Sequence, residues 1–211
     1  MKIYLKKCLP AIVLSFLFSF FALTTLEAKV KIHSIKSPNG DLELQVVTDT
    51  NISFCLLHKD NVLVTSPALS MTLKDGTILG PNAQVRKARK TDSREIIASP
   101  LYRKSQIVDQ YQQLDVNFRG GFGIRFRVYD QGAAYQFYTV QKDSLCVVNE
   151  SAGFIFDRDH TCYVPYSRGE ENPFQNSFEN VYSVIPVSEF DREKLAFLPL
   201  LVCLENGMKM A

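Results

Sequence analysis

The chain has 211 residues, with 24 Lys and Arg, 22 Asp and Glu, and a formal net charge of +2. This near balance does not indicate nucleic acid or an anionic membrane surface as a partner. The length predicts one domain that buries about 70% of its unfolded surface, with no internal repeat or linker in view.

Residues 1–28 have the layout of a secretory signal peptide. Three lysines precede an apolar run at 9–23, and small and polar residues then lead to Ala28. The run is about 15 residues long, whereas a spanning helix needs roughly 20, so a membrane anchor is the less favoured alternative. Cleavage after Ala28 leaves 29–211, in which 21 basic residues balance 21 acidic ones. We expect a periplasmic or secreted domain with no membrane contact after signal cleavage.

From residue 30 onward the pattern is that of short β-strands. Apolar and polar residues alternate through 30–35, 42–47 and 52–56, which is the period of a half-buried strand. Turn residues separate them, such as Ser-Pro-Asn-Gly at 37–40 and Asp-Gly at 75–76. Further strands of the first half are expected at 62–64, 71–73, 78, 85–90 and 95–98, the last two more charged and solvated.

The clearest hairpin follows Gly120-Gly121, which predicts a turn and not a nucleotide loop because GxGxxG spacing and a P-loop lysine are absent. Its strands flank a Tyr-Asp-Gln-Gly turn, where we expect Gly132 to supply a positive φ. More than ten short strands without a capped helical stripe predict an all-β, antiparallel two-sheet sandwich. In the second half of the chain, strands are expected at 111–118, 122–129, 134–141, 145–148, 154–156, 162–164, 182–186 and 196–204.

Two polar motifs could bind metal but have plainer interpretations. Asp157, Asp159 and His160 lie within four residues, yet metal ligands need a converging geometry, and a solvated turn is the better interpretation. The cysteines of 29–211 are widely spaced in apolar surroundings, which favours buried free thiols, although an oxidising compartment permits disulfides. No Cys or His spacing indicates zinc. These cysteines are Cys55, Cys146, Cys162 and Cys203.

The segment 163–182 is the best candidate for sugar recognition. It combines carboxylates, amides and aromatic rings, which are the groups that contact sugar hydroxyls and sugar faces. A plain surface loop is the alternative. Long loops with several aromatic residues favour function, because exposed rings mark interaction sites.

Several phrases, in order, resemble the amino-terminal β-sandwich of glycoside hydrolase family 97. They are KSPNG at 36–40, Ser-Pro at 66–67, FRVYDQGAAYQF at 126–137, FENVY at 178–182 and FLPLLV at 197–202. The resemblance covers nearly all of 29–211. It implies a galactose-mutarotase-like super-sandwich and a parent enzyme of the α-glucosidase or α-galactosidase type.

The resemblance also implies where function would lie. In that family a Glu of this domain reaches across to a catalytic barrel and helps to hold calcium beside the sugar, and by position Glu179 is the candidate. Glu170 and Glu171 are less favoured alternates. Calcium takes six to eight oxygens, so one Glu is insufficient and the ion requires the barrel domain. No catalytic residue is expected here, and no substrate-binding residue is assigned.

The chain shows no alternating strand–helix pattern and is too short for a (β/α)₈ barrel. We expect it to be inactive alone, with an α-linked saccharide and a barrel, in cis or from an adjacent gene, as partners. The final strand, turn and return strand suggest a domain that is incomplete at its carboxyl end. A free-standing carbohydrate-binding sandwich of the envelope and a structural sandwich without ligand are the alternatives.

Overall fold

The computed structural model describes residues 31–101, 103–168, 172, 174, 178–204 and 209–210. The expected signal peptide, Glu170 and Glu171 lie outside these described residues. Residues 31–211 belong to one compact unit. Among the described residues, no helix has the length and apolar character needed to cross a membrane.

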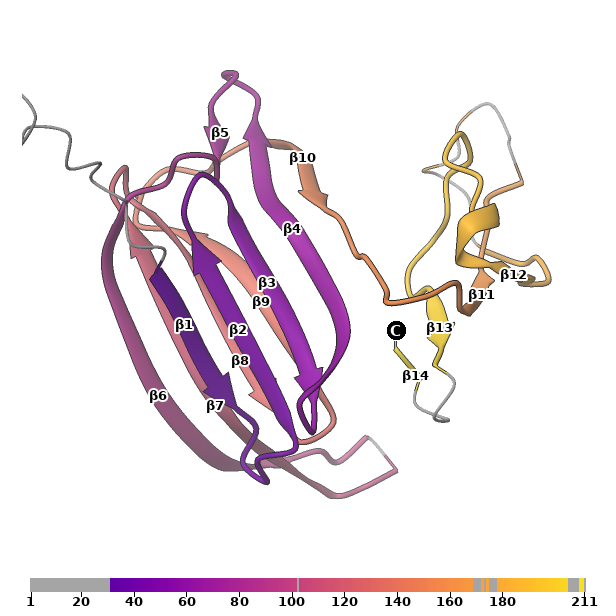
Figure 1. Cartoon of the computed structure of the whole chain (residues 1–211), viewed down its shortest axis with the longest axis horizontal. Coiled ribbons are helices and arrows are strands. Elements are labelled where there is room, and N and C mark those ends of the chain that lie inside the picture. Colours follow the sequence, from indigo (N-terminus) through magenta and orange to yellow (C-terminus); the bar gives the residue numbers. More distant parts are fainter. Residues whose placement is uncertain are drawn as a thin grey trace, which may run out of the picture. The chain divides into compact units, whose positions relative to one another are not determined.

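The first sheet is antiparallel, in the order β1-β2-β3-β4-β10, with β5 added to β4 (Figure 1). Its first four strands follow the chain as a meander, and the fifth returns from much later in the sequence. Its strands are β1 (Lys31–Lys36), β2 (Leu42–Thr48), β3 (Ile52–His58), β4 (Asn61–Leu73), β5 (Ile78–Leu79) and β10 (Val147–Ala152).

The second sheet is an antiparallel meander in the order β6-β7-β8-β9, stacked against the first (Figure 1). The β6–β7 pair is the longest of the fold, and its register runs from the Val85–Phe118 pair to the Ala98–Gln106 pair. The strands are β6 (Val85–Ala98), β7 (Gln106–Phe118), β8 (Phe122–Tyr129) and β9 (Gly132–Thr139).

A smaller third sheet has the order β12-β11-β13-β14. Cys162 and Val202 lie opposite each other on neighbouring strands, and both are buried. Because opposite residues share a face, one side of this sheet packs on the core. The short 3-10 turn η2 (Val187–Glu189) follows β12. The strands are β11 (Thr161–Val164), β12 (Ser183–Pro186), β13 (Leu201–Cys203) and β14 (Lys209–Met210).

Aliphatic and aromatic side chains from the facing sides of the two large sheets form the core. Phe126 is 1% exposed, and the Phe54 ring meets it edge-on at 6.4 Å between centroids. At one margin Tyr135 of β9 donates a 2.6 Å hydrogen bond to Glu150 of β10, which ties the second sheet to the first. The expected all-β, antiparallel two-sheet sandwich is therefore confirmed.

Several strand boundaries differ from those expected. The strands expected at 62–64 and 71–73 are parts of β4, and those at 85–90 and 95–98 are parts of β6. Pairing with a long neighbouring strand supplies backbone hydrogen bonds even where side-chain alternation is weak. Residues 154–156 form no strand but one bridge between Ile155 and Thr65, and of 196–204 only Leu201–Cys203 is a strand.

The expected positive φ at Gly132 is wrong. Gly132 is the first residue of β9 and pairs with Tyr129, so Asp130 and Gln131 alone form the turn. The glycines with positive φ include Gly120 and Gly121, which form the β7–β8 turn as expected, but not Gly132.

Candidate functional site

The segment after β11 is held in place by backbone pairing. Tyr166 forms an isolated antiparallel bridge with Ala196, and the amide of Ser167 donates to the carbonyl of Leu195 at 2.8 Å. The amide of Phe197 donates to the carbonyl of Pro165 at 2.9 Å. The backbone of residues 165–167 is therefore fixed near the start of the 163–182 segment.

Arg168 and Asn180 join the two ends of the 163–182 segment. The Nε of Arg168 donates to the Oδ1 of Asn180, and its Nη2 approaches the carbonyl oxygen of Glu179 at 3.4 Å. The Nδ2 of Asn180 donates to the carbonyl of Tyr166 at 3.3 Å. The Phe178 ring packs on Phe197, with centroids 5.8 Å apart. Both neighbours of Glu179 are thus anchored.

The Glu179 side chain itself is exposed. Within the described residues its carboxylate accepts no hydrogen bond from another side chain, and no group of three His, Cys, Asp or Glu side chains could hold a metal ion. Its donor chemistry suits calcium, which prefers carboxylate oxygens, but one carboxylate provides one or two of six to eight ligands. Glu179 could serve as a single ligand to an ion held mainly by another domain.

Apolar side chains are exposed beside Glu179. Val181 is 93% exposed, and the next residue, Tyr182, leads into β12. On the outer side of the small sheet, Tyr163 lies opposite Val184 on one neighbouring strand and Leu201 on the other. We call Tyr163, Val184 and Leu201 the apolar row. Soluble domains rarely leave such rows uncovered, so this face has the character of an interaction surface.

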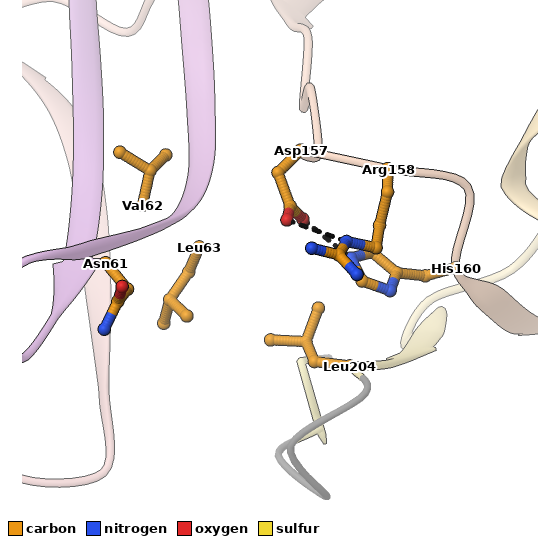
Figure 2. Close-up of a pocket in the computed structure, with 7 residues that line it drawn as sticks. All are labelled: Asn61, Val62, Leu63, Asp157, Arg158, His160 and Leu204. Carbon is orange, nitrogen blue, oxygen red and sulfur yellow. Dashed lines mark hydrogen bonds and ion pairs between the residues drawn. The ribbon is translucent and has the colours of Figure 1, made fainter.

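The Asp157–His160 motif begins as an exposed bend, in which Asp157, Arg158 and Asp159 face solvent as expected of a solvated turn, but its last residue, His160, is buried. His160 is 6% exposed, and its Nε2 donates to the Oδ1 of Asp157 at 2.9 Å, a contact drawn in Figure 2. This hydrogen bond holds the pKa of Asp157 below its usual value, and Arg158 adds to the effect. The motif borders a cavity of about 220 Å³, which Leu63 and Leu204 also line.

Asp159 from the same motif has a structural role. Its two carboxylate oxygens accept hydrogen bonds from the hydroxyl and the amide of Ser188, at 2.6 and 2.9 Å. These bonds hold the pKa of Asp159 below its usual value. The carboxylate therefore fastens the start of β11 to η2, although sequence spacing gave no indication of this pairing across 29 positions.

The four cysteines are free, as expected, but they are not all buried. Cys162 is buried, and desolvation raises the pKa of its thiol, which keeps it in the neutral form. Cys146 is exposed, while Cys55 and Cys203 are half-buried. The prediction that Cys146 is buried is wrong because this residue precedes β10 and its apolar neighbours do not lie in the core.

The sequence pointed to Glu179 but not to Arg168 and Asn180, which hold the backbone beside it. Arg168 and Asn180 are 12 positions apart and neither lies in a strand, so no periodicity relates them. The Phe178 and Phe197 contact joins two phrases that the sequence showed separately. Only the packed structure brings these groups to the backbone on either side of Glu179.

The fold and the site define an antiparallel β-sandwich domain in which an exposed carboxylate, Glu179, lies on an anchored backbone ahead of a strand of the smaller sheet. The sequence profile described as "Glycosyl-hydrolase 97 N-terminal" matches residues 35–211. The chain therefore belongs to the Glycosyl-hydrolase 97 N-terminal family.

Individual relatives agree with this assignment. A retaining alpha-galactosidase of Bacteroides thetaiotaomicron is 32% identical over 182 residues, which cover 84% of this chain and 28% of that protein. The chain thus spans about 28% of the length of this curated relative.

Solved structures share the fold. A Glycoside Hydrolase Family 97 enzyme of a Pseudoalteromonas species, in complex with panose, superposes with a TM-score of 0.69 at 18% identity. That match covers 84% of this chain and 27% of the enzyme. A beta-arabinopyranosidase superposes with a TM-score of 0.72 at 20% identity, over 84% of this chain and 30% of its own.

Proposed function

We propose that this chain is the non-catalytic amino-terminal domain of a family 97 glycoside hydrolase that acts on an α-linked saccharide. The observation that carries the proposal is Glu179, an exposed carboxylate on an anchored backbone beside exposed apolar side chains. A retaining alpha-galactosidase relative and a relative in complex with panose support an α-glycoside as the substrate class.

In this proposal the apolar row and Val181 pack against a (β/α)₈ barrel, in cis or encoded by an adjacent gene. Glu179 then supplies one oxygen ligand to a calcium ion in the sugar pocket, and the barrel supplies the remaining ligands. The two carboxyl groups that glycoside hydrolysis needs also come from the barrel. Calcium, when bound there, would order the pocket wall and neutralise nearby carboxylates.

The calcium test compares Glu179→Gln with Glu189→Gln in the complex of this chain with its barrel. Glu189 is a matched control because it is also an exposed Glu and lies ten positions further along the chain. We expect Glu179→Gln to raise the calcium concentration for half-maximal α-glycoside hydrolysis by about tenfold or more, since a carboxylate ligand becomes an amide. An unchanged calcium requirement in Glu179→Gln would contradict the assignment.

The non-catalytic role has a separate test. The chain alone is assayed with α-glucosides and α-galactosides under conditions where the complex turns them over, and we expect no hydrolysis. Enzyme-like turnover by the isolated chain would show that it holds its own catalytic groups.

We also propose that residues 1–28 direct export and that 29–211 is the periplasmic or secreted domain. The apolar run at 9–23 and the small residues before Ala28 support this. Amino-terminal sequencing of the exported protein should begin at Lys29. A product that retains residues 1–28 and stays in the membrane fraction would favour the anchor instead.

A further inference from the structure

The β6–β7 pair extends beyond the rest of its sheet. The β7–β8 ladder begins at the Gln112–Val128 pair, so residues 106–111 of β7 have β6 as their only ladder partner among the described strands. The β6–β7 connection and the β1–β2 turn lie at the same end of the domain, at the bottom of Figure 1. This overhang leaves one side of β7 uncovered next to the β8–β9 turn.

A cleft of about 640 Å³ fills the angle between the overhang and the β8–β9 turn. Gln106, Val108 and Gln110 line it from alternate positions of β7, which is the spacing of side chains on one face of a strand. Ile107, which lies between them, also borders the cleft. Gln131 of the turn and Ala133 of β9 line the opposite side. The volume lies within the range of small-molecule sites, about 300–1,000 Å³.

The amides in the cleft are available for a ligand. Gln106, Gln110 and Gln131 make no side-chain hydrogen bond to any residue that the structure describes. By contrast, Gln113 on the other face of β7 is fully engaged, because it donates to Asp115 and accepts from Arg127. A primary amide offers both donors and an acceptor, and a sugar hydroxyl requires both.

The charges at the cleft indicate an uncharged ligand. Lys104 and Asp130 are the only charged residues of the lining, one of each sign. The Oδ1 of Asp130 already accepts a hydrogen bond of 2.8 Å from the backbone amide of Asn39. A balanced rim attracts neither anions nor cations strongly. Apolar contact is available from Val108, which is 56% exposed. Tyr129 also lines the cleft, and its ring packs on that of Tyr111 with centroids 5.3 Å apart.

We propose that this cleft is a second binding site of the domain, which takes a neutral oligosaccharide. The three amides bind hydroxyls, while Val108 contacts the apolar face of a sugar ring. The site uses neither Glu179 nor a residue of a barrel, so it goes beyond the proposed function.

The test is a titration of the full chain with panose and with maltotriose, followed by calorimetry and by ligand-observed NMR. The variants are Gln106→Leu, Gln110→Leu and Gln131→Leu, which keep side-chain size but remove the amide. Gln136→Leu is the matched control, since Gln136 is exposed on β9 and does not line the cleft. We expect each cleft variant to weaken binding about fivefold, the worth of one hydrogen bond. Gln136→Leu and Glu179→Gln should leave binding unchanged.

Three results would overturn the proposal. One is the absence of binding at about 10 mM of either saccharide, because a dissociation constant above that concentration is too weak for a binding site. The second is binding that Glu179→Gln removes and the cleft variants do not, which would locate the sugar at Glu179. The third is a dimer in analytical ultracentrifugation that the cleft variants dissociate, because the occupant would then be a second copy of the chain.

Discussion

The packing of β8 against β9 can be tested at Gly123. Gly123 lies opposite Tyr138 in the ladder, and the aromatic ring covers the position that a side chain would take. A Cβ added there would lie 2.5 Å from the Cζ of Tyr138 and 2.8 Å from the backbone oxygen of Val116. The ring cannot swing away freely, because the Tyr138 hydroxyl donates to Asn117 at 2.9 Å and Arg125 lies 5.4 Å from the ring centroid.

These contacts set the expected cost of Gly123→Ala. Overpacking of a well-packed site costs about 1–3 kcal/mol, and the backbone contact with Val116 puts this case at the upper end. Replacing Gly by Ala also lowers the entropy of the unfolded chain, which returns about 0.4–1 kcal/mol. The net loss is about 2 kcal/mol in the free energy of unfolding, or roughly 4–8 °C in Tm for a domain of this size.

Urea denaturation of Gly123→Ala, Tyr138→Ala and the double variant measures this loss. Because Tyr138→Ala removes the ring contact but leaves that with Val116, we expect the double variant to lose about 1 kcal/mol less than the two single variants together. Gly132→Ala is the matched control in the same hairpin: its Cβ meets nothing within 4 Å and its φ is not positive, so stability should stay equal or rise. Strictly additive losses, or a destabilised Gly132→Ala, would refute this account of the hairpin.

Three further predictions concern titratable groups. Burial lowers the pKa of His33 below 6.5, so the unfolded chain takes up a proton first and stability falls as pH drops below about 6.5; His33→Leu should remove this slope in denaturation curves from about pH 7 to 5. Hydrogen bonds from Ser188 lower the pKa of Asp159, so its carboxylate stabilises the fold fully above the pKa that it has in the unfolded chain. This stabilisation is lost as pH falls through the pKa of Asp159 in the folded chain. Asp159→Asn should therefore flatten the fall of stability with pH below about pH 4, and an unchanged fall would contradict this assignment. Tyr135→Phe removes the hydrogen bond to Glu150 and should cost about 1 kcal/mol, since the exposed carboxylate regains water; a loss near zero in thermal melts would show that this contact does not hold the two sheets together.

The strands that the sequence located best are those with one buried face. In β2 and β8 the buried apolar side chains lie at every second position, and both strands lie where the alternation predicted them. In β6, charged residues occupy both faces, so the pattern suggested two short strands in place of one. Pairing with β7 along its full length decides the extent of β6, and a neighbouring strand leaves no mark in local periodicity.

The candidate site, like the strands, could be predicted from the sequence only in part. Glu179 could be selected because its phrase resembles a family motif, and His160 stood out because it lies among acidic residues. Neither observation predicted that Arg168 and Asn180 would hold the backbone at Glu179, or that Asp159 would bind Ser188. These contacts join residues in irregular segments, where no repeat relates one position to another.

The sequence by itself determined the all-β class, the family and the positions of most turns, because these depend on period-two alternation, turn chemistry and ordered phrases. Tertiary structure alone decided which glycines need their conformation, which amides remain without partners at the β6–β7 overhang, and which apolar residues stay exposed beside Glu179. The physical reason is that strand alternation is a local property, whereas the pairing, covering and satisfying of groups depend on segments that only folding brings together.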